Sequence, residues 1–306
     1  MKPAPALRGP VVWPLLLLVS APALWGGNFV VGRYLSPDIP AAWLNFLCWS
    51  NAALVIAPLG LQALITHWRP IQADFGKLTV LALLGVVGFN SALYAALKTV
   101  DTSDAAIGFA ATPIVMVLIN SLLMARMPSL NTMMCCLFAF AGTVLAFHPA
   151  VAGKGPGDVW RLAMLLGPPV VIWSVYSLCL KHLRLNTPPL AAFFAQVLIG
   201  LLVQAGIVML AAPEFALSGI DPGSVVAIGY LGVFAAAVAF LCWQAALRTF
   251  SAAQASMAMF LVPLTSLLRA WAVLGERLSV RQVAGVMMIF SGVLYLHWNQ
   301  IGRNNA

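Results

Sequence analysis

Long apolar stretches, each about the length of a membrane-spanning helix, occupy most of this chain. A helix needs about 20 residues to cross the hydrocarbon core of a bilayer. Segments of this kind, bounded by Pro, Gly or charged residues, lie at 12–32, 41–62, 78–98, 103–124, 130–148, 159–180, 187–211, 222–247, 253–273 and 282–298. They lack the alternating pattern of membrane β-strands. The sequence therefore predicts an all-α integral membrane protein with ten transmembrane helices.

The composition agrees with a membrane protein and excludes an ordinary soluble domain. Of the 306 residues, 62% are hydrophobic and 8% are charged, whereas soluble domains carry roughly 25% charged residues. The net charge of +8 comes from Lys and Arg scattered through short loops, without the basic stripe of a nucleic-acid-binding protein. The apolar run that follows Lys2 and Arg8 leads into many more spans, so we interpret it as the first membrane helix and not as a cleaved signal.

Two parts of the chain repeat each other at a nearly constant spacing. Residues 91–129 align with residues 241–279 at a shift of 150. At this shift the sequence AALKT matches AALRT, and Pro113 matches Pro263. In the first helix of each half, the shift is 148 and Trp25 matches Trp173. Matches at fixed offsets indicate an internal repeat.

Each half of the chain would then hold five of the ten predicted spans. Duplicating an odd number of spans makes the second copy enter the membrane from the opposite side. We therefore expect residues 1–150 and 151–306 to form two inverted five-helix repeats around a central cavity. Loop charges favour cytoplasmic termini, because the inner loops would then carry more Lys and Arg than the outer loops. The predicted location is the cell inner membrane, with both termini cytoplasmic.

Several motifs resemble those of a known transporter family. The opening pattern is LWGGNFVVG at residues 24–32, and the second predicted helix follows Pro40. The strongest match is Pro263 followed by LGERLS at residues 274–279. In these features the chain is similar to the EamA branch of the drug/metabolite transporter superfamily, and within it to aromatic amino-acid exporters. The first half departs from the pattern, because ARM at residues 125–127 stands where the second half has GER.

The resemblance implies a ten-helix exporter of small metabolites. In related transporters the first, third, fourth, sixth, eighth and ninth helices surround the cavity, and the fifth and tenth lie outside it. We expect no cofactor or metal, because the chain has no nucleotide-binding P-loop and its five Cys residues lack metal-ligand spacing. The expected partners are a small-molecule substrate and the lipid bilayer, without nucleic acid. The default expectation for the assembly is a monomer.

None of the eight acidic residues falls at the middle of a predicted span. A proton-coupled antiporter of the small multidrug type relies on a carboxylate there, and ionisable groups inside a membrane generally mark function. Asp101 and Asp104, at the turn between the third and fourth spans, are the nearest candidates. They fit solvated loop acids better than coupling acids. Uncoupled export or exchange is therefore favoured, and a proton-coupled antiporter is the alternative.

Uncharged aromatic and polar side chains recur at matching positions of the two halves. Trp25 and Asn28 lie one turn apart on the first predicted helix and share a face. Trp173 and Tyr176 repeat this spacing on the sixth helix. Facing a central cavity, these groups could stack on and hydrogen-bond a planar, amphiphilic solute. They could instead hold helices together or face lipid near the interface, but their symmetric placement favours the cavity.

The third and eighth predicted helices add a second set of candidates. Asn90 and Tyr94 form an i,i+4 pair on the third helix, and the eighth carries Trp243 and Gln244. An Asn or Gln in hydrocarbon is costly unless it has a partner. Cavity lining and interhelical hydrogen bonding account for these four residues equally well.

Three residues of the fourth and ninth helices complete the candidates. Pro113 and Pro263 each free a backbone carbonyl and permit a bend, which could serve as a hinge when the two halves rock; a static kink is the alternative. Arg269 lies in an otherwise apolar part of the ninth helix. Snorkelling of its side chain to the outer headgroups is the favoured interpretation, and an anchor for a substrate carboxylate is the alternative.

Together these features favour a secondary-type transporter that exports small metabolites by alternating access. Amino acids, with aromatic or other neutral side chains, suit the predicted lining. An enzyme embedded in the membrane is a minor alternative, because the intramembrane His/Asp, Ser/Lys or metal-ligand sets that it needs are not visible. A structural or assembly protein would not need matched inverted repeats around a cavity.

Overall fold

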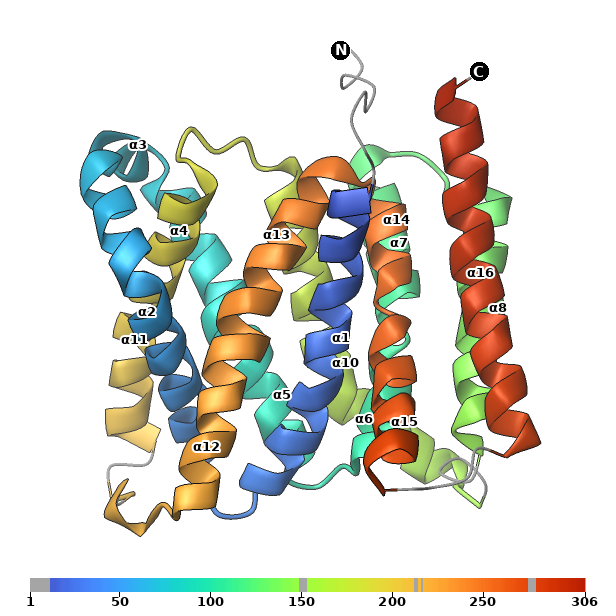
Figure 1. Ribbon diagram of the computed structural model, residues 1–306, viewed down its shortest axis with the longest axis horizontal. Helices are drawn as coiled ribbons and strands as arrows, with labels where there is room; N and C mark the ends of the chain where they lie inside the picture. Colours follow the sequence, from blue (N-terminus) through green and yellow to red (C-terminus); the bar gives the residue numbers. More distant parts are fainter. Residues whose placement is uncertain (1–11, 149–152, 212–213, 216, 275–278, 306) are drawn as a thin grey trace.

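The computed structural model describes residues 12–148, 153–211, 214–215, 217–274 and 279–305. Within these residues every regular element is a helix, and the helices lie side by side in one bundle (Figure 1). The predicted all-α fold is therefore confirmed.

The helices of the first half follow the predicted spans closely. They are α1 (Val12–Leu35), α2 (Ala41–Thr66), α4 (Phe75–Leu81), η1 (Ala82–Phe89), α5 (Asn90–Leu97), α6 (Thr102–Phe109), α7 (Thr112–Met124) and α8 (Leu130–Ala146). The short helix α3 (Trp68–Ala73), in the loop after α2, has no counterpart among the predicted elements. Its six residues are too few and too polar for a membrane span.

The helices of the second half repeat this order. They are α10 (Pro156–His182), α11 (Pro189–Ala211), α12 (Pro222–Tyr230), η3 (Leu231–Val238), α13 (Ala239–Thr249), α14 (Ala252–Ala258), α15 (Leu261–Leu274) and α16 (Val280–Asn305). The short 3₁₀ helix η2 (Leu217–Gly219) precedes α12.

Within the described ranges, seven of the predicted spans are helical segments long and apolar enough to cross a membrane. The other three are helices with shorter apolar parts, at Leu130–Ala146, Ala252–Leu268 and Val280–Leu296. A multi-pass membrane protein is therefore confirmed, and ten crossings and the inverted arrangement stay predictions. Val12 at the start of α1 and Asn305 at the end of α16 lie at the same end of the bundle (Figure 1).

Two π-helical segments, η1 and η3, occupy matching positions in the third and eighth predicted spans. Each is eight residues long, and η3 begins 149 residues after η1. A π-helix shifts the backbone hydrogen bonds and is frequent at functional sites. Here both segments offer carbonyl oxygens to side chains of other helices. Trp25 Nε1 donates to Ala235 O at 2.9 Å, and Gln204 Nε2 donates to Val86 O at 2.9 Å.

The fourth and ninth predicted spans are each divided just before their proline. α6 ends at Phe109 and α7 begins at Thr112, while α14 ends at Ala258 and α15 begins at Leu261. Tight i→i+3 hydrogen bonds close both junctions, such as Ala111 N to Gly108 O at 3.1 Å and Phe260 N to Met257 O at 3.2 Å. The interruptions expected at Pro113 and Pro263 are present. Their use as hinges stays a prediction.

A cation at the end of α1, and another at the end of α10, binds the last carbonyls of a neighbouring helix. Arg33 Nη1 donates to Leu97 O at 2.6 Å and to Lys98 O at 2.8 Å. Lys181 Nζ donates to Leu247 O and to Phe250 O, both at 2.7 Å. Cations stabilise the carbonyl end of a helix. We call these two contacts the end clasps; they lie at opposite ends of the bundle, where α1 and α10 finish (Figure 1).

The helices α8 and α16 pack against each other at one side of the bundle (Figure 1). Gly142 of α8 and Gly285 of α16 make this close approach possible. A Cβ on Gly142 would lie 2.8 Å from Gly285 O and 3.2 Å from Ile289 N. Because both neighbours are backbone atoms, they cannot move aside without separating the helices.

We expect Gly142→Val to lower the free energy of unfolding by about 2 kcal/mol, the cost of overpacking a rigid contact. The measurement is the midpoint of thermal unfolding in detergent. Gly206→Val on α11 is the matched control, because a Cβ there meets nothing within 4 Å. Equal midpoints for the two variants would contradict the role of Gly142 in helix packing.

Candidate transport site

A cluster of aromatic side chains from both halves of the chain fills the middle of the helix bundle. The rings of Trp25 and Trp173 meet edge to face, with centroids 4.7 Å apart. Trp243 lies 5.6 Å from Trp25 and 5.8 Å from Trp173. All three side chains are buried, with at most 4% of their surface exposed. The structure thus brings together three residues that the sequence predicts for one site. We call these three rings, with Phe240 and Tyr176, the aromatic cluster.

Phe240 contacts several rings of this cluster, and the sequence analysis did not identify it as a site residue. Its ring lies 5.3 Å from Trp173, 5.7 Å from Trp25 and 5.9 Å from Tyr176. It also contacts Trp49, with centroids 4.9 Å apart. The available signal was helical spacing, because Phe240 precedes Trp243 by three residues and therefore shares its face.

Most polar atoms of the aromatic cluster are hydrogen-bonded, but one is left over. Trp243 Nε1 donates to Ser177 Oγ at 3.1 Å, and Gln244 Nε2 donates to Tyr176 Oη at 3.4 Å. Trp25 Nε1 donates to Ala235 O. Among the described residues, Trp173 Nε1 has no hydrogen-bond partner. In the first half, the carbonyl that corresponds to Ala235 O is Val86 O of η1, and it already accepts hydrogen bonds from other side chains.

Two side chains donate hydrogen bonds to Val86 O. Asn45 Nδ2 donates to Val86 O at 3.1 Å and Gln204 Nε2 donates to it at 2.9 Å. A carbonyl oxygen has two lone pairs, so Val86 O is saturated. The two halves therefore differ at the centre: Trp25 is fixed by a backbone bond, whereas Trp173 keeps a donor available.

The other predicted polar residues lie beside this cluster. Tyr94 Oη donates to Asn28 Oδ1 at 3.1 Å and contacts Cys48 Sγ at 3.8 Å. This pair joins two predicted residues, and both are buried. Asn90 is buried as well, and its Oδ1 atom lacks a partner in the described part of the chain. Asn90 thus presents a hydrogen-bond acceptor near the end of η1.

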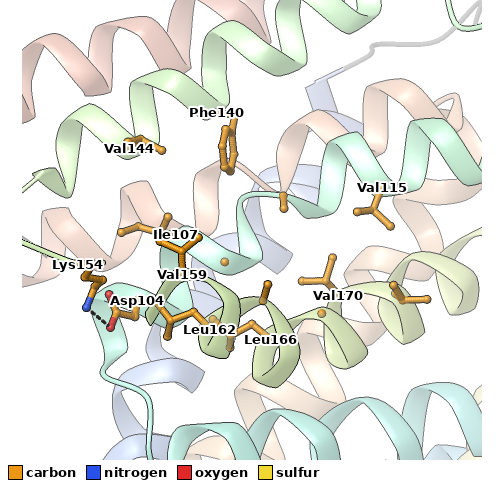
Figure 2. Close-up of a pocket in the computed structure, with 15 residues that line it drawn as sticks. Asp104, Ile107, Val115, Phe140, Val144, Lys154, Val159, Leu162, Leu166 and Val170 are labelled. Atoms are coloured by element: carbon orange, nitrogen blue, oxygen red, sulfur yellow. Dashed lines mark hydrogen bonds and ion pairs between the residues drawn. The ribbon is translucent and has the colours of Figure 1, made fainter. Parts of the chain in front are cut away.

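The centre of the bundle is packed in this structure, whereas the sequence predicts that these residues line an open cavity. Large aromatic side chains gain from burying surface against one another when no solute separates them. A pocket of about 410 Å³ lies elsewhere, between α6, α7, α8 and α10 (Figure 2). Substrate binding by the predicted residues stays a prediction.

Asp104 differs from the expected solvated acid. Only 8% of this residue is exposed, and its Oδ2 accepts a hydrogen bond from Lys154 Nζ at 3.0 Å. Its Oδ1 atom is without a partner in the ranges that the structure describes. Asp101 is the solvated acid that we expected, with 80% of its side chain exposed, beside Arg33 at 3.5 Å.

Arg269 and the GER turn of the second half can be placed only in part. Arg269 lies in α15, but its side chain is outside the described residues, as is the GER turn at 275–277. The five Cys residues are unpaired thiols. The described residues contain no group of three His, Cys, Asp or Glu side chains that could hold a metal ion.

Comparisons with known proteins agree with this architecture. The profile of the EamA-like transporter family matches residues 12–148 and again residues 161–298. An uncharacterized transporter of Bacillus subtilis, YyaM, is 23% identical over 289 residues, covering 91% of this chain and 92% of the relative. An uncharacterized transporter of Archaeoglobus fulgidus is 23% identical over 283 residues, covering 91% and 96%.

A solved crystal structure has the same fold. It superposes with a TM-score of 0.73 at 19% sequence identity, covering 92% of this chain and 94% of the other. The two matches to the family profile together cover most of the chain, and the relatives are named as transporters. This protein is therefore a membrane transporter that belongs to the EamA-like transporter family.

Proposed function

We propose that this protein exports small neutral metabolites, aromatic amino acids foremost, by alternating access. The observation that carries the proposal is the aromatic cluster, which is built from both halves and contains no charged side chain. Among the described residues, Trp173 Nε1 and Trp49 Nε1 are unused donors in or beside it, and Asn90 Oδ1 is an unused acceptor.

An amino acid with an aromatic ring matches these groups. Its ring can replace one of the edge-to-face contacts of Trp25 and Trp173, which are each worth about 1 kcal/mol. Its carboxylate accepts hydrogen bonds and its ammonium donates them, so the free atoms of Trp173 and Asn90 suit the two ends. Each charged end of a zwitterion needs a hydrogen-bond partner when it leaves water, and these two atoms offer one partner to each end.

Alternating access would separate the rings of the aromatic cluster and open one end of the bundle at a time. The end clasps of Arg33 and Lys181 hold helix ends on opposite sides, so releasing one while keeping the other would open a single face. The divided helices at Pro113 and Pro263 are the places where we expect bending. In this proposal residues 1–150 and 151–306 are the two inverted repeats of a monomer, placed in the inner membrane with both termini cytoplasmic.

Proton-coupled antiport is a second candidate, favoured by one observation. Buried ionisable groups in membrane-spanning segments commonly mark function; Asp104 is buried, and its Oδ1 atom has no partner among the described residues. Its position in the first turn of α6, far from the middle of the span, makes uncoupled export the better proposal.

The test is uptake of labelled phenylalanine, tryptophan, threonine and methionine into proteoliposomes, with and without an imposed pH gradient. We expect saturable uptake of phenylalanine and tryptophan that does not respond to the gradient. Uptake that requires the gradient, and loses this requirement in Asp104→Asn but not in Asp101→Asn, would favour proton-coupled antiport. Absence of uptake for all four solutes would refute the amino-acid assignment.

A further inference from the structure

A pocket opens on the side of the helix bundle, away from the aromatic cluster. It has a volume of about 410 Å³ and lies between α6, α7, α8 and α10. Figure 2 shows apolar side chains along most of its wall and a single ion pair, Asp104 with Lys154, at one end. The wall includes Ile107, Val115, Phe140 and Leu166.

The pocket faces the surroundings of the bundle and not its centre. Val159 and Val171, which both line it, are 55% and 45% exposed. α10 and the segment Thr102–Met124 have the length and hydropathy of membrane spans. An apolar pocket on the outer side of such helices meets the hydrocarbon of the bilayer and is filled by it.

The ion pair lies where the pocket reaches the ends of the helices. Asp104 is in the first turn of α6, and Lys154 lies two residues before Pro156, the first residue of α10. This level corresponds to the headgroups when the helices span the hydrocarbon. Asp104 Oδ2 binds Lys154, but Asp104 Oδ1 is buried without a partner in the described structure. Lys154 Nζ can donate three hydrogen bonds, and its bond to Asp104 uses one of them.

We propose that this pocket binds one membrane lipid whose headgroup carries a primary amine and a phosphate, as phosphatidylethanolamine does. The ammonium group donates to the Asp104 carboxylate, the phosphate accepts from Lys154 Nζ, and an acyl chain lies along the apolar wall. The charges are complementary: the negative Asp104 faces the positive ammonium of the headgroup, and the positive Lys154 faces its negative phosphate. A choline headgroup has no N–H to donate, and a glycerol headgroup has no positive charge.

Two substitutions separate the contribution of the lipid's acyl chain to binding from that of its headgroup. Gly167 lines the pocket, and a Cβ built on it meets nothing within 4 Å. Gly167→Leu therefore places a side chain in the pocket without disturbing the fold, and Gly206→Leu on α11 is its matched control. Asp104→Asn removes the charge that binds the amine, and Asp101→Asn, on the same helix end outside the pocket, is its control.

The experiment reconstitutes each variant in vesicles of phosphatidylethanolamine, phosphatidylcholine and phosphatidylglycerol in equal amounts, with identical acyl chains. The protein is then extracted in mild detergent and washed, and the retained lipids are measured by mass spectrometry. We expect the unchanged protein and both controls to retain phosphatidylethanolamine roughly tenfold over the other two, the effect of one charge-assisted hydrogen bond. This selectivity is expected to disappear in Asp104→Asn, and retention itself in Gly167→Leu.

Two results would overturn the proposal. Equal retention of lipid by Gly167→Leu and Gly206→Leu would mean that retained lipid binds outside this pocket. An unchanged preference among headgroups in Asp104→Asn would mean that the carboxylate does not bind the amine. Neither readout depends on the transported solute, so the lipid site and the proposed transport function can fail separately.

Discussion

Trp173→Phe is expected to lower the rate of phenylalanine and tryptophan transport about tenfold, with a loss of only about 1 kcal/mol of unfolding free energy. The substitution keeps an aromatic ring in the cluster and removes Nε1, which has no partner among the described residues. No hydrogen bond among the described residues is lost. The smaller ring costs about 1 kcal/mol of unfolding free energy, whereas the substrate loses a hydrogen-bond donor.

The matched variant is Trp25→Phe, at the related position of the first half. It removes the same atom, but here Nε1 donates to Ala235 O. A buried carbonyl left without its partner costs about 1 to 3 kcal/mol. We therefore expect Trp25→Phe to be less stable than Trp173→Phe by about 2 kcal/mol.

Both variants are compared by thermal unfolding in detergent and by uptake in proteoliposomes, with uptake normalised to folded protein. The predicted result is a crossed pattern, in which Trp173→Phe loses transport and Trp25→Phe loses stability. Normal transport by Trp173→Phe would show that Nε1 is not a substrate contact. Equal loss of stability in both variants would show that the bond to Ala235 contributes nothing.

The helices could be predicted from the sequence because the bilayer imposes their length and apolar character. The repeat also paired Trp25 with Trp173, and these two rings meet in one cluster with Trp243. Asn28 and Tyr94, assigned to different helices, are hydrogen-bonded to each other. Helical spacing and the internal repeat indicate which face of a helix a residue lies on. Residues on the facing sides of neighbouring helices then come into contact.

Other features depend on distances that a pattern cannot give. The π-helical segments η1 and η3 have no composition that separates them from ordinary apolar helix. The packing of the Phe240 ring against rings of α1, α2 and α10 follows from the tertiary arrangement of these helices with α13. The contact between Asp104 and Lys154 could not be predicted either, because the two residues are 50 positions apart in the chain and Lys154 lies in a loop between two predicted spans.

Asp74 is another residue whose contacts the sequence did not reveal, and it joins the two halves at one end of the bundle. It lies between α3 and α4, and its Oδ2 accepts hydrogen bonds from Asn186 N at 2.6 Å and from Thr187 N at 2.9 Å. Lys77 Nζ donates to its Oδ1 at 2.9 Å. Asn186 and Thr187 belong to the loop between α10 and α11.

The pKa of Asp74 shows how strongly these contacts favour the charged form. Burial alone would raise the pKa, but the hydrogen bonds from Lys77, Thr187 and Asn186 outweigh burial and lower it to about 2. The ordinary value for an unfolded chain is about 4. A lowered pKa in the folded state stabilises the fold above the unfolded value, by about 2 kcal/mol here. This contribution is lost as the pH falls from about 4 to about 2.

Asp74→Asn is expected to lower the free energy of unfolding by about 3 kcal/mol at neutral pH, because it leaves Lys77 without its partner carboxylate and weakens the contacts with the loop. The difference from the unchanged protein should shrink as the pH falls through the window between about 4 and 2, where Asp74 itself becomes protonated. Thermal unfolding across this range measures the difference. Asp38→Asn, at an exposed acid in another loop, should show neither effect. A difference that is the same at pH 7 and at pH 2 would mean that the charge of Asp74 does not hold the two halves together.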